Sequence, residues 1–100
     1  MIHHLQVKKL NFWQSLFGLI GKDNPEPVLI NTRFGIHTFG LKFPIDIVIC
    51  DKNFIIKSLK ENLKPSRIYI WNPRYDKVIE LPTGMIKEKK IKNGAKVEIV

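Results

Sequence analysis

The stretch "FPIDIVICD", residues 43 to 51, constrains the fold of this chain more than any other segment. Residues 45 to 50 are rich in β-branched side chains and are apolar on both faces, apart from one acid, Asp46. Such a run is typical of a strand inside a sheet that is covered on both sides. Pro44 cannot donate a hydrogen bond to a neighbouring strand, so it marks the start of this strand. We therefore expect a β-rich core with Asp46 near a strand end.

The other segments predict more short strands and two short helices. Strands are expected at residues 2–8, 28–32, 34–41, 54–59, 67–71 and 77–81, and from residue 96 onward, with a hairpin turn at residues 51–53 leading into 54–59. One helix is expected at 12–20, between an Asn11 cap and Gly21, and another at 83–91 with Thr83 as its cap. The expected fold class is α+β and mainly β, a compact antiparallel β-sandwich or barrel-like sheet with two short helices. With 100 residues and no linker or repeat, we expect a single domain spanning 1–100.

The net charge of +8 raises the possibility of nucleic-acid binding. Isoleucine, lysine and asparagine, which have A/T-rich codons, make up 36 of the 100 residues, so an A/T-rich genome is an alternative explanation for much of the lysine. Arginine, the usual residue for bidentate contacts to bases and phosphates, occurs only three times. Abundant lysine also fits a thermophilic surface. Nucleic acid is therefore a possible partner but not the favoured one.

Location is indicated by the cysteine count and by the lack of a long apolar run. Cys50 is the only cysteine, which excludes an internal disulfide and favours a reducing compartment. The helix expected at 12–20 is about half the roughly 20 residues that a membrane span needs, and its alternative is a helix lying on a membrane surface. Ala95 is the only alanine, so no A-x-A signal cleavage site exists. We expect a cytoplasmic protein without a leader segment.

Two stretches carry a resemblance to a known family. The centre reads "TFGLKFPIDIVICD" and the end reads "KVIELPTGMIKEKKIKNGAKVEI". Together they resemble the domain of unknown function 192 family, whose centre has an aromatic-Met-basic stretch, a Pro-hydrophobic-Asp and an apolar strand ending in Asp. Leu41 stands where methionine is common, and Lys42 matches the basic position. The segment "GIHTFG" is similar to the archaeal branch.

The resemblance extends from about Leu5 to Val100. It implies a small β-rich domain with no established biochemical activity. It supports the fold and offers no reaction, so the function has to be argued from individual residues.

Asp46 is the first residue that could carry a function. Alternation along the strand places Asp46, Val48 and Cys50 on one face and the isoleucines on the other. An ionised carboxylate inside a core is costly unless it is paired or hydrogen-bonded. In one interpretation Asp46 accepts backbone N–H bonds and holds the turn at Pro44. In the other it forms the floor of a small pocket lined by Arg33, His37 and Lys42.

Catalytic and metal chemistry find little support in the sequence. Hydrolysis would rest only on His37 near Asp46, and a metal site would still lack ligands there. Cys50 is expected to be a small buried hydrophobe, since a nucleophile needs a base and an electropositive site. Neither GxGxxG nor GxxxxGK occurs, so no phosphate-binding loop is indicated. We expect no metal, no cofactor and no catalytic residue.

The stretch "YIWNPRY", residues 69 to 75, interleaves aromatic residues with arginine. Trp71 and Arg74 are binding candidates because such pairs stack on bases or sugars. Tyr69 and Trp71 share one strand face, so packing against the core is the alternative. The run "KEKKIK", residues 87 to 92, is interpreted as a solvated charged face.

These observations favour a non-catalytic binding domain for a small ligand or a protein partner. Its tentative binding residues are Arg33, His37, Lys42, Asp46, Trp71 and Arg74. The alternatives are nucleic-acid binding through a lysine-rich face and a hydrolytic enzyme that uses His37 and Asp46.

Overall fold

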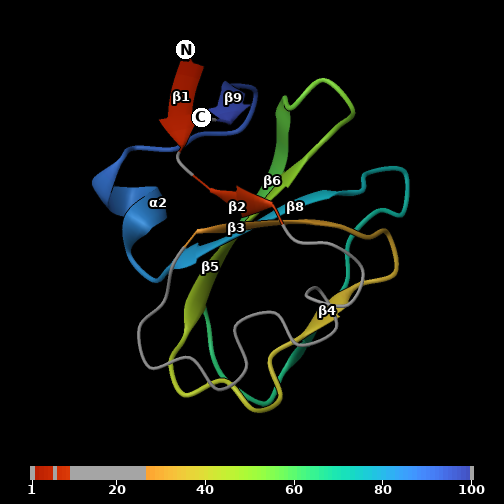
Figure 1. Ribbon diagram of the computed structural model, residues 1–100, viewed down its shortest axis with the longest axis vertical. Helices are drawn as coiled ribbons and strands as arrows, with labels where there is room; N and C mark the ends of the chain where they lie inside the picture. The colour runs from red at the N-terminus through yellow and green to blue at the C-terminus, as the bar shows by residue number, and fades with distance from the viewer. Residues whose placement is uncertain (1, 6, 10–26, 100) are drawn as a thin grey trace.

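The computed structural model describes residues 2–5, 7–9 and 27–99 (Figure 1). The helix expected at 12–20 lies outside the described residues. The strands are β1 Ile2–Leu5, β2 Lys8–Lys9, β3 Val28–Asn31, β4 Ile36–His37, β5 Ile45–Cys50, β6 Ile56–Leu63, β7 Ile68–Tyr69, β8 Lys77–Pro82 and β9 Lys96–Ile99, and one helix, α2, spans Met85–Glu88. Within the described residues no helix has the length and apolarity needed to cross a membrane.

The largest sheet has five strands in the order β2-β3-β8-β5-β6. The pairs β3–β8, β8–β5 and β5–β6 are antiparallel, whereas β2 pairs in parallel with β3. Two further sheets have two strands each: β1 with β9, in parallel, and β4 with β7, antiparallel. Figure 1 shows α2 beside the end of β8 and β5, and β4 at the other side of the molecule. Strand β5, which lies between β8 and β6, is buried along its whole length.

Two apolar clusters explain why β5 is apolar on both faces. Val48 and Cys50 belong to one cluster, which also contains Ile86 of α2. Ile45, Ile47 and Ile49 belong to the other. The second cluster is flanked by Ile36, Phe43, Tyr69, Trp71 and Tyr75. The alternation expected from the sequence is therefore what the structure has, and both faces of the inner strand exclude water.

The expected fold class is confirmed in its main features, because the chain is mainly β with antiparallel pairing in the principal sheet. Three finer features differ. The described strands form separate sheets and do not close into a barrel. Two strand pairs are parallel. Strand β1 pairs with β9 and strand β2 pairs with β3, and in each pair the two strands are separated by many residues of sequence. The described residues contain one short helix where two were expected in the whole chain.

Helix α2 is shorter than the expected 83–91, and its cap is not Thr83. The residue before the helix is Gly84, which has φ +91°. Glycine has no side chain, so it cannot cap the helix by a side-chain hydrogen bond. At the other end Lys90 adopts φ +53°, and the N–H of Ile91 donates to the carbonyl of Ile86 at 2.9 Å. This bond closes a Schellman turn, which ends the helix at Glu88, although the lysine-rich run continues to residue 92.

The hairpin between β5 and β6 also differs in its limits. Asp51 Oδ1 accepts hydrogen bonds from the N–H groups of Asn53, at 2.8 Å, and Ile55, at 3.0 Å. Phe54 takes φ +60° within this turn, so β6 begins at Ile56 and not at residue 54. At its far end β6 continues to Leu63, beyond the expected residue 59. The turn itself was predicted correctly, and the acid at its first position holds it.

Candidate functional site

Asp46 lies where β5 meets an irregularity in β6. Ile45 pairs with Leu63, but Ile47 pairs with Lys60, so two residues of β6 stand opposite Asp46. This extra residue is a β-bulge, which leaves a backbone N–H without a ladder partner. Asn62, with φ +55°, donates that N–H to Asp46 Oδ1 at 2.9 Å. The carboxylate thus satisfies a donor that the sheet cannot.

The second carboxylate oxygen of Asp46 holds the start of α2. Oδ2 accepts hydrogen bonds from the N–H groups of Gly84 and Ile86, both at 3.0 Å. The Thr83 hydroxyl donates to Oδ1 at 3.3 Å. Asp46, which lies on β5, therefore caps the start of α2, and its side chain is completely buried. We call this set, Asp46, Asn62, Thr83, Gly84 and Ile86, the Asp46 junction.

The structural interpretation of Asp46 was right about its backbone donors and wrong about where they come from. The three N–H groups belong to the bulge and to α2, not to the turn at Pro44. Sequence distance hides this, since Asp46 is 38 residues before Gly84. Only the pairing of β5 with β6 and β8 brings the partners together.

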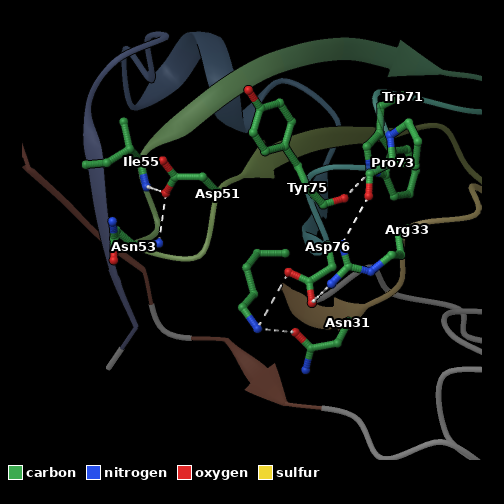
Figure 2. A network of polar contacts seen from close by, with 10 residues as sticks. Asn31, Arg33, Asp51, Asn53, Ile55, Trp71, Pro73, Tyr75 and Asp76 are labelled. Carbon is green, nitrogen blue, oxygen red and sulfur yellow. Dashed lines mark hydrogen bonds and ion pairs between the residues drawn. The ribbon is translucent and has the colours of Figure 1, made fainter.

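Arg33 does not join Asp46. Its Nη1 donates to the carbonyl of Pro73 at 3.1 Å, and its Nη2 lies 3.5 Å from Asp76 Oδ2 (Figure 2). Asp76 directly precedes β8, whereas Asp46 stands opposite Leu81 near the other end of that strand. Asp76 and Leu81 are five residues apart, which is about 17 Å along an extended strand. The expected grouping of Arg33 around Asp46 is therefore wrong.

His37 and Lys42 also have their own surroundings. His37, on β4, is exposed and pairs across the ribbon with Ile68, and its ring stacks on Phe39 with centroids 5.2 Å apart. Lys42 is exposed in the loop before β5. The hydrogen bonds of the Asp46 carboxylate come from Asn62, Thr83, Gly84 and Ile86, so His37 does not provide one. In the described part of the chain, no three His, Cys, Asp or Glu side chains gather where they could hold a metal ion.

Trp71 packs inward, while Arg74 stays outside. The Trp71 ring lies at the edge of the core cluster on one side of β5, 6.0 Å from the ring of Tyr69. Its Nε1 donates to the carbonyl of Tyr75 at 2.7 Å, which closes the turn at 72–75 (Figure 2). Arg74 is exposed in that turn. The inward packing is the alternative that the shared strand face of Tyr69 and Trp71 predicted.

Burial raises the pKa of two titratable groups, Cys50 and Glu80. Burial, reinforced by the nearby charge of Asp51, raises the pKa of the Cys50 thiol to about 12. A thiol of this kind is not a nucleophile at neutral pH. Glu80 of β8 is buried between Val28 and Ile47 of the neighbouring strands, and burial raises its pKa to about 7. Sequence reasoning missed Glu80, although an acid within the apolar run "VIEL" was the available signal.

The outward face of the β4–β7 pair is the main surface that sequence reasoning missed. Ile36 and Tyr69 face the core, so their neighbours His37 and Ile68 face outward as a pair. Ile70 follows on the same side and covers Gly35, whose added Cβ would lie 2.8 Å from Ile70 Cγ2. Phe34, Phe39, Ile68 and Ile70 are 88%, 48%, 69% and 71% exposed. We call the set Phe34, His37, Phe39, Ile68 and Ile70 the ribbon face.

The signal for the ribbon face was present in the alternation of "RIYIW". Tyr69 and Trp71 on one side of that strand leave Ile68 and Ile70 on the other. A short strand that is apolar on both sides buries its apolar surface fully only when other groups pack against each side. Here the core packs against one side, and among the described residues nothing buries Ile68 and Ile70 on the other.

Comparison with known proteins gives both sequence and structural relatives. The model of the DUF192 family, described as "Uncharacterized ACR", matches residues 11–99. A UPF0127 protein of the archaeon Pyrococcus abyssi is 35% identical over 95 residues, which covers 88% of this chain and 80% of that protein.

Two solved structures share the fold. A protein of unknown function from Novosphingobium aromaticivorans has a TM-score of 0.75 at 14% identity, covering 88% of this chain and 69% of that one. A protein from Sinorhizobium meliloti described as a "putative transcription regulator" has a TM-score of 0.70 at 19% identity, covering 93% and 76%. At such identities the likeness concerns the fold alone. The family match and the archaeal relative together show that this chain belongs to the domain of unknown function 192 family.

Proposed function

We propose that this protein is a non-catalytic binding domain that docks a protein partner on the ribbon face. One observation carries the proposal: Ile68 of β7, Ile70 directly after β7 and Phe34 shortly before β4 are each more than two-thirds exposed. Scattered single hydrophobic side chains on a surface need no explanation, but a contiguous group marks an interaction site. Aromatic side chains and arginine are also the residues that protein interfaces enrich.

A protein partner is favoured over the other functions considered from the sequence. Hydrolysis would need His37 to work with Asp46, but the Asp46 carboxylate receives its hydrogen bonds from the Asp46 junction. A small polar ligand would need convergent polar groups, whereas Ile68 and Ile70 offer aliphatic surface. A cytoplasmic, reducing location belongs to the proposal and is supported by Cys50, which is a free, buried thiol.

Nucleic-acid binding is the alternative, supported by the exposed lysines around α2, Lys87, Lys89, Lys90 and Lys92. This run contains no arginine or aromatic residue, which weakens the case for base or phosphate recognition. Non-specific binding of roughly 10⁻⁴ to 10⁻⁶ M at physiological salt is what such a run supports. Tight, salt-tolerant binding to one DNA or RNA sequence would favour this alternative over docking on the ribbon face.

The proposal is tested by crosslinking at a defined position. A photo-crosslinking amino acid in place of Ile70, in cells of the source organism or a close relative, should yield a discrete adduct with one protein. The same group in place of Lys87, an exposed position on α2, is the control and should not yield that adduct.

The identified partner is then purified and its affinity measured by calorimetry. The double substitution Ile68→Ser with Ile70→Ser should weaken binding at least about a hundredfold, since interface energy concentrates in a few buried apolar side chains. Lys87→Ser with Lys89→Ser should change it less than about twofold. Equal binding by both double variants would show that the partner docks elsewhere.

A further inference from the structure

We propose that the segment docked on the ribbon face is acidic: an apolar stretch of another protein with carboxylates on both sides. This inference rests on the proposed function and adds the chemistry of the partner. It starts from the three arginines of the chain: Arg33 and Arg67 are sequence neighbours of the ribbon face, and Arg74 follows Pro73, whose carbonyl accepts a hydrogen bond from Arg33.

The arginines stand at both ends of the exposed apolar residues. Arg67 directly precedes Ile68, and its backbone is held by Thr38, the residue that directly follows β4. Arg33 directly precedes Phe34 and donates to the carbonyl of Pro73, the residue before Arg74. Ile68 of β7 and Ile70 directly after it thus lie between Arg67 at one end and the positions of Arg33 and Arg74 at the other.

The choice of arginine over lysine carries information in this chain. Lysine supplies 14 of the 17 basic residues, so a general need for positive charge is met by lysine. Arginine differs in its planar fork, which binds a carboxylate through two parallel hydrogen bonds and stays charged when it is partly desolvated. Its restriction to one small surface fits recognition of carboxylates better than non-specific charge. An anionic lipid surface, by contrast, attracts lysine and arginine alike.

The charge of this surface is only partly balanced within the described residues. Arg33 lies 3.5 Å from Asp76, but Asp76 is shared with Lys77 at 3.8 Å. Among the residues that the structure describes, the Arg67 side chain donates only to the neighbouring carbonyl of Ser66, at 3.4 Å. The Arg74 guanidinium has no hydrogen bond or ion pair within the described part of the chain. A partner with carboxylates would supply what the protein itself does not.

A second copy of this chain fits the ribbon face poorly. Two-fold symmetric interfaces place the same patch of each copy against itself. Such pairing would bring six arginine side chains together around an apolar centre, and like charges in an interface cost several kcal/mol. The occupant is therefore a different chain with the opposite charge.

The probe is a soluble peptide with an apolar centre and acidic ends, EELVFLEE, compared with QQLVFLQQ and KKLVFLKK. Binding is followed by NMR shifts of His37, Ile68 and Ile70 in the full-length protein. We expect the acidic peptide to shift these signals and to bind at least about tenfold more tightly than the glutamine peptide. The basic peptide should give no shifts. Vesicles of phosphatidylcholine with phosphatidylglycerol are tested by co-sedimentation under the same salt conditions.

Triple variants test whether the acidic peptide needs the arginines or only positive charge. Replacing Arg33, Arg67 and Arg74 by glutamine should weaken the acidic peptide at least about tenfold, and replacing them by lysine should weaken it by a smaller factor. Lys87→Gln, Lys89→Gln and Lys92→Gln together remove the same charge beside α2 and should change binding less than about twofold.

Each outcome decides between the possibilities. Equal binding of the acidic and glutamine peptides overturns the acidic partner but leaves docking on the ribbon face intact. Binding that is unaffected by Ile68→Ser with Ile70→Ser overturns the docking face itself. No shift with the acidic peptide up to about 5 mM, or binding to vesicles alone, overturns the inference.

Discussion

The Asp46 junction buries a charged side chain, whereas the ribbon face exposes apolar side chains to water. Asp46 is an acid with no exposed surface, and Ile70 is an aliphatic side chain that is 71% exposed. Both depart from the ordinary preference of charged residues for water and of isoleucine for the core. They differ in whether the protein itself explains them.

The acid is accounted for by groups within the chain. Three backbone N–H groups and one hydroxyl meet its two oxygens, so the cost of removing a carboxylate from water is offset by partners that would otherwise be unpaired themselves. The exposed isoleucines have no such compensation in the described residues. A buried polar group with complete partners indicates architecture, whereas an exposed apolar group without a cover indicates an interaction with something else.

The largest effect is expected for Asp46→Ala. The substitution leaves the N–H of Ile86 buried without an acceptor and those of Asn62 and Gly84 without their native partner, so the free energy of unfolding should fall by roughly 4 kcal/mol. Urea denaturation of the variant measures this fall. A midpoint close to that of the unaltered protein would break the comparison, because Asp46 would no longer be an architectural residue.

Asp51→Ala is the matched control for Asp46→Ala. Asp51 also accepts two backbone N–H bonds, and the bond from Ile55 lowers the pKa of its carboxyl, but it stands in a turn that water reaches. The donors freed by this substitution can bond to water, so the loss should be only about 1 kcal/mol. Similar losses for both variants would show that burial of the junction adds nothing.

Glu80 sharpens the comparison, since it is a buried acid whose pKa burial raises from 4.5 to about 7. In the folded protein it keeps its proton up to about pH 7, whereas in the unfolded chain it loses the proton above about pH 4.5. The unfolded state therefore binds fewer protons between these values, and stability falls as the pH rises through this window. The full loss, about 3 kcal/mol, is reached above the folded pKa.

Glu80→Gln removes the titrating group with little change in size. The variant should lack the fall in stability between pH 4.5 and 7 and should be more stable than the unaltered protein at pH 8. Thermal unfolding measured across this pH range tests the expectation. A fall of the same size in both proteins would assign the pH dependence to another group.

The smallest effect on stability is expected for Ile68→Ser with Ile70→Ser. Both side chains are mostly in water, so the free energy of unfolding should change by less than about 0.5 kcal/mol per site. Calorimetry of the isolated protein measures it. A loss of several kcal/mol would mean that these side chains are covered by the chain itself, and the contrast with the Asp46 junction would disappear.

Strand-level features could be predicted because they depend on neighbours in sequence. The alternation of β5, the hairpin turn at Asp51 and the inward face of Tyr69 and Trp71 each follow from a short stretch of residues. The end of α2 was missed because Lys90 adopts a left-handed conformation that no lysine signals in advance. The parallel pairs were missed because each joins segments far apart in the chain.

For the candidate site, the sequence identified one residue that matters and grouped it with the wrong partners. An acid inside "IDIVIC" had to be hydrogen-bonded, whatever the fold, because an unpaired buried carboxylate is too costly. Arg33 was chosen as a partner for its charge, yet it contacts Asp76, which precedes β8 by one residue and lies about 17 Å along the chain from Leu81, the residue opposite Asp46.

The sequence by itself determined the mainly β class, the doubly covered inner strand and the need of Asp46 for donors, since these depend on side-chain periodicity and on the cost of burying charge. Tertiary structure alone decided which donors Asp46 meets and which side of "RIYIW" stays in water. A bulge opposite Asp46 and the one-sided packing of β4 and β7 arise from register between distant segments. Register is set by how whole strands fit together, and no single stretch of residues contains it.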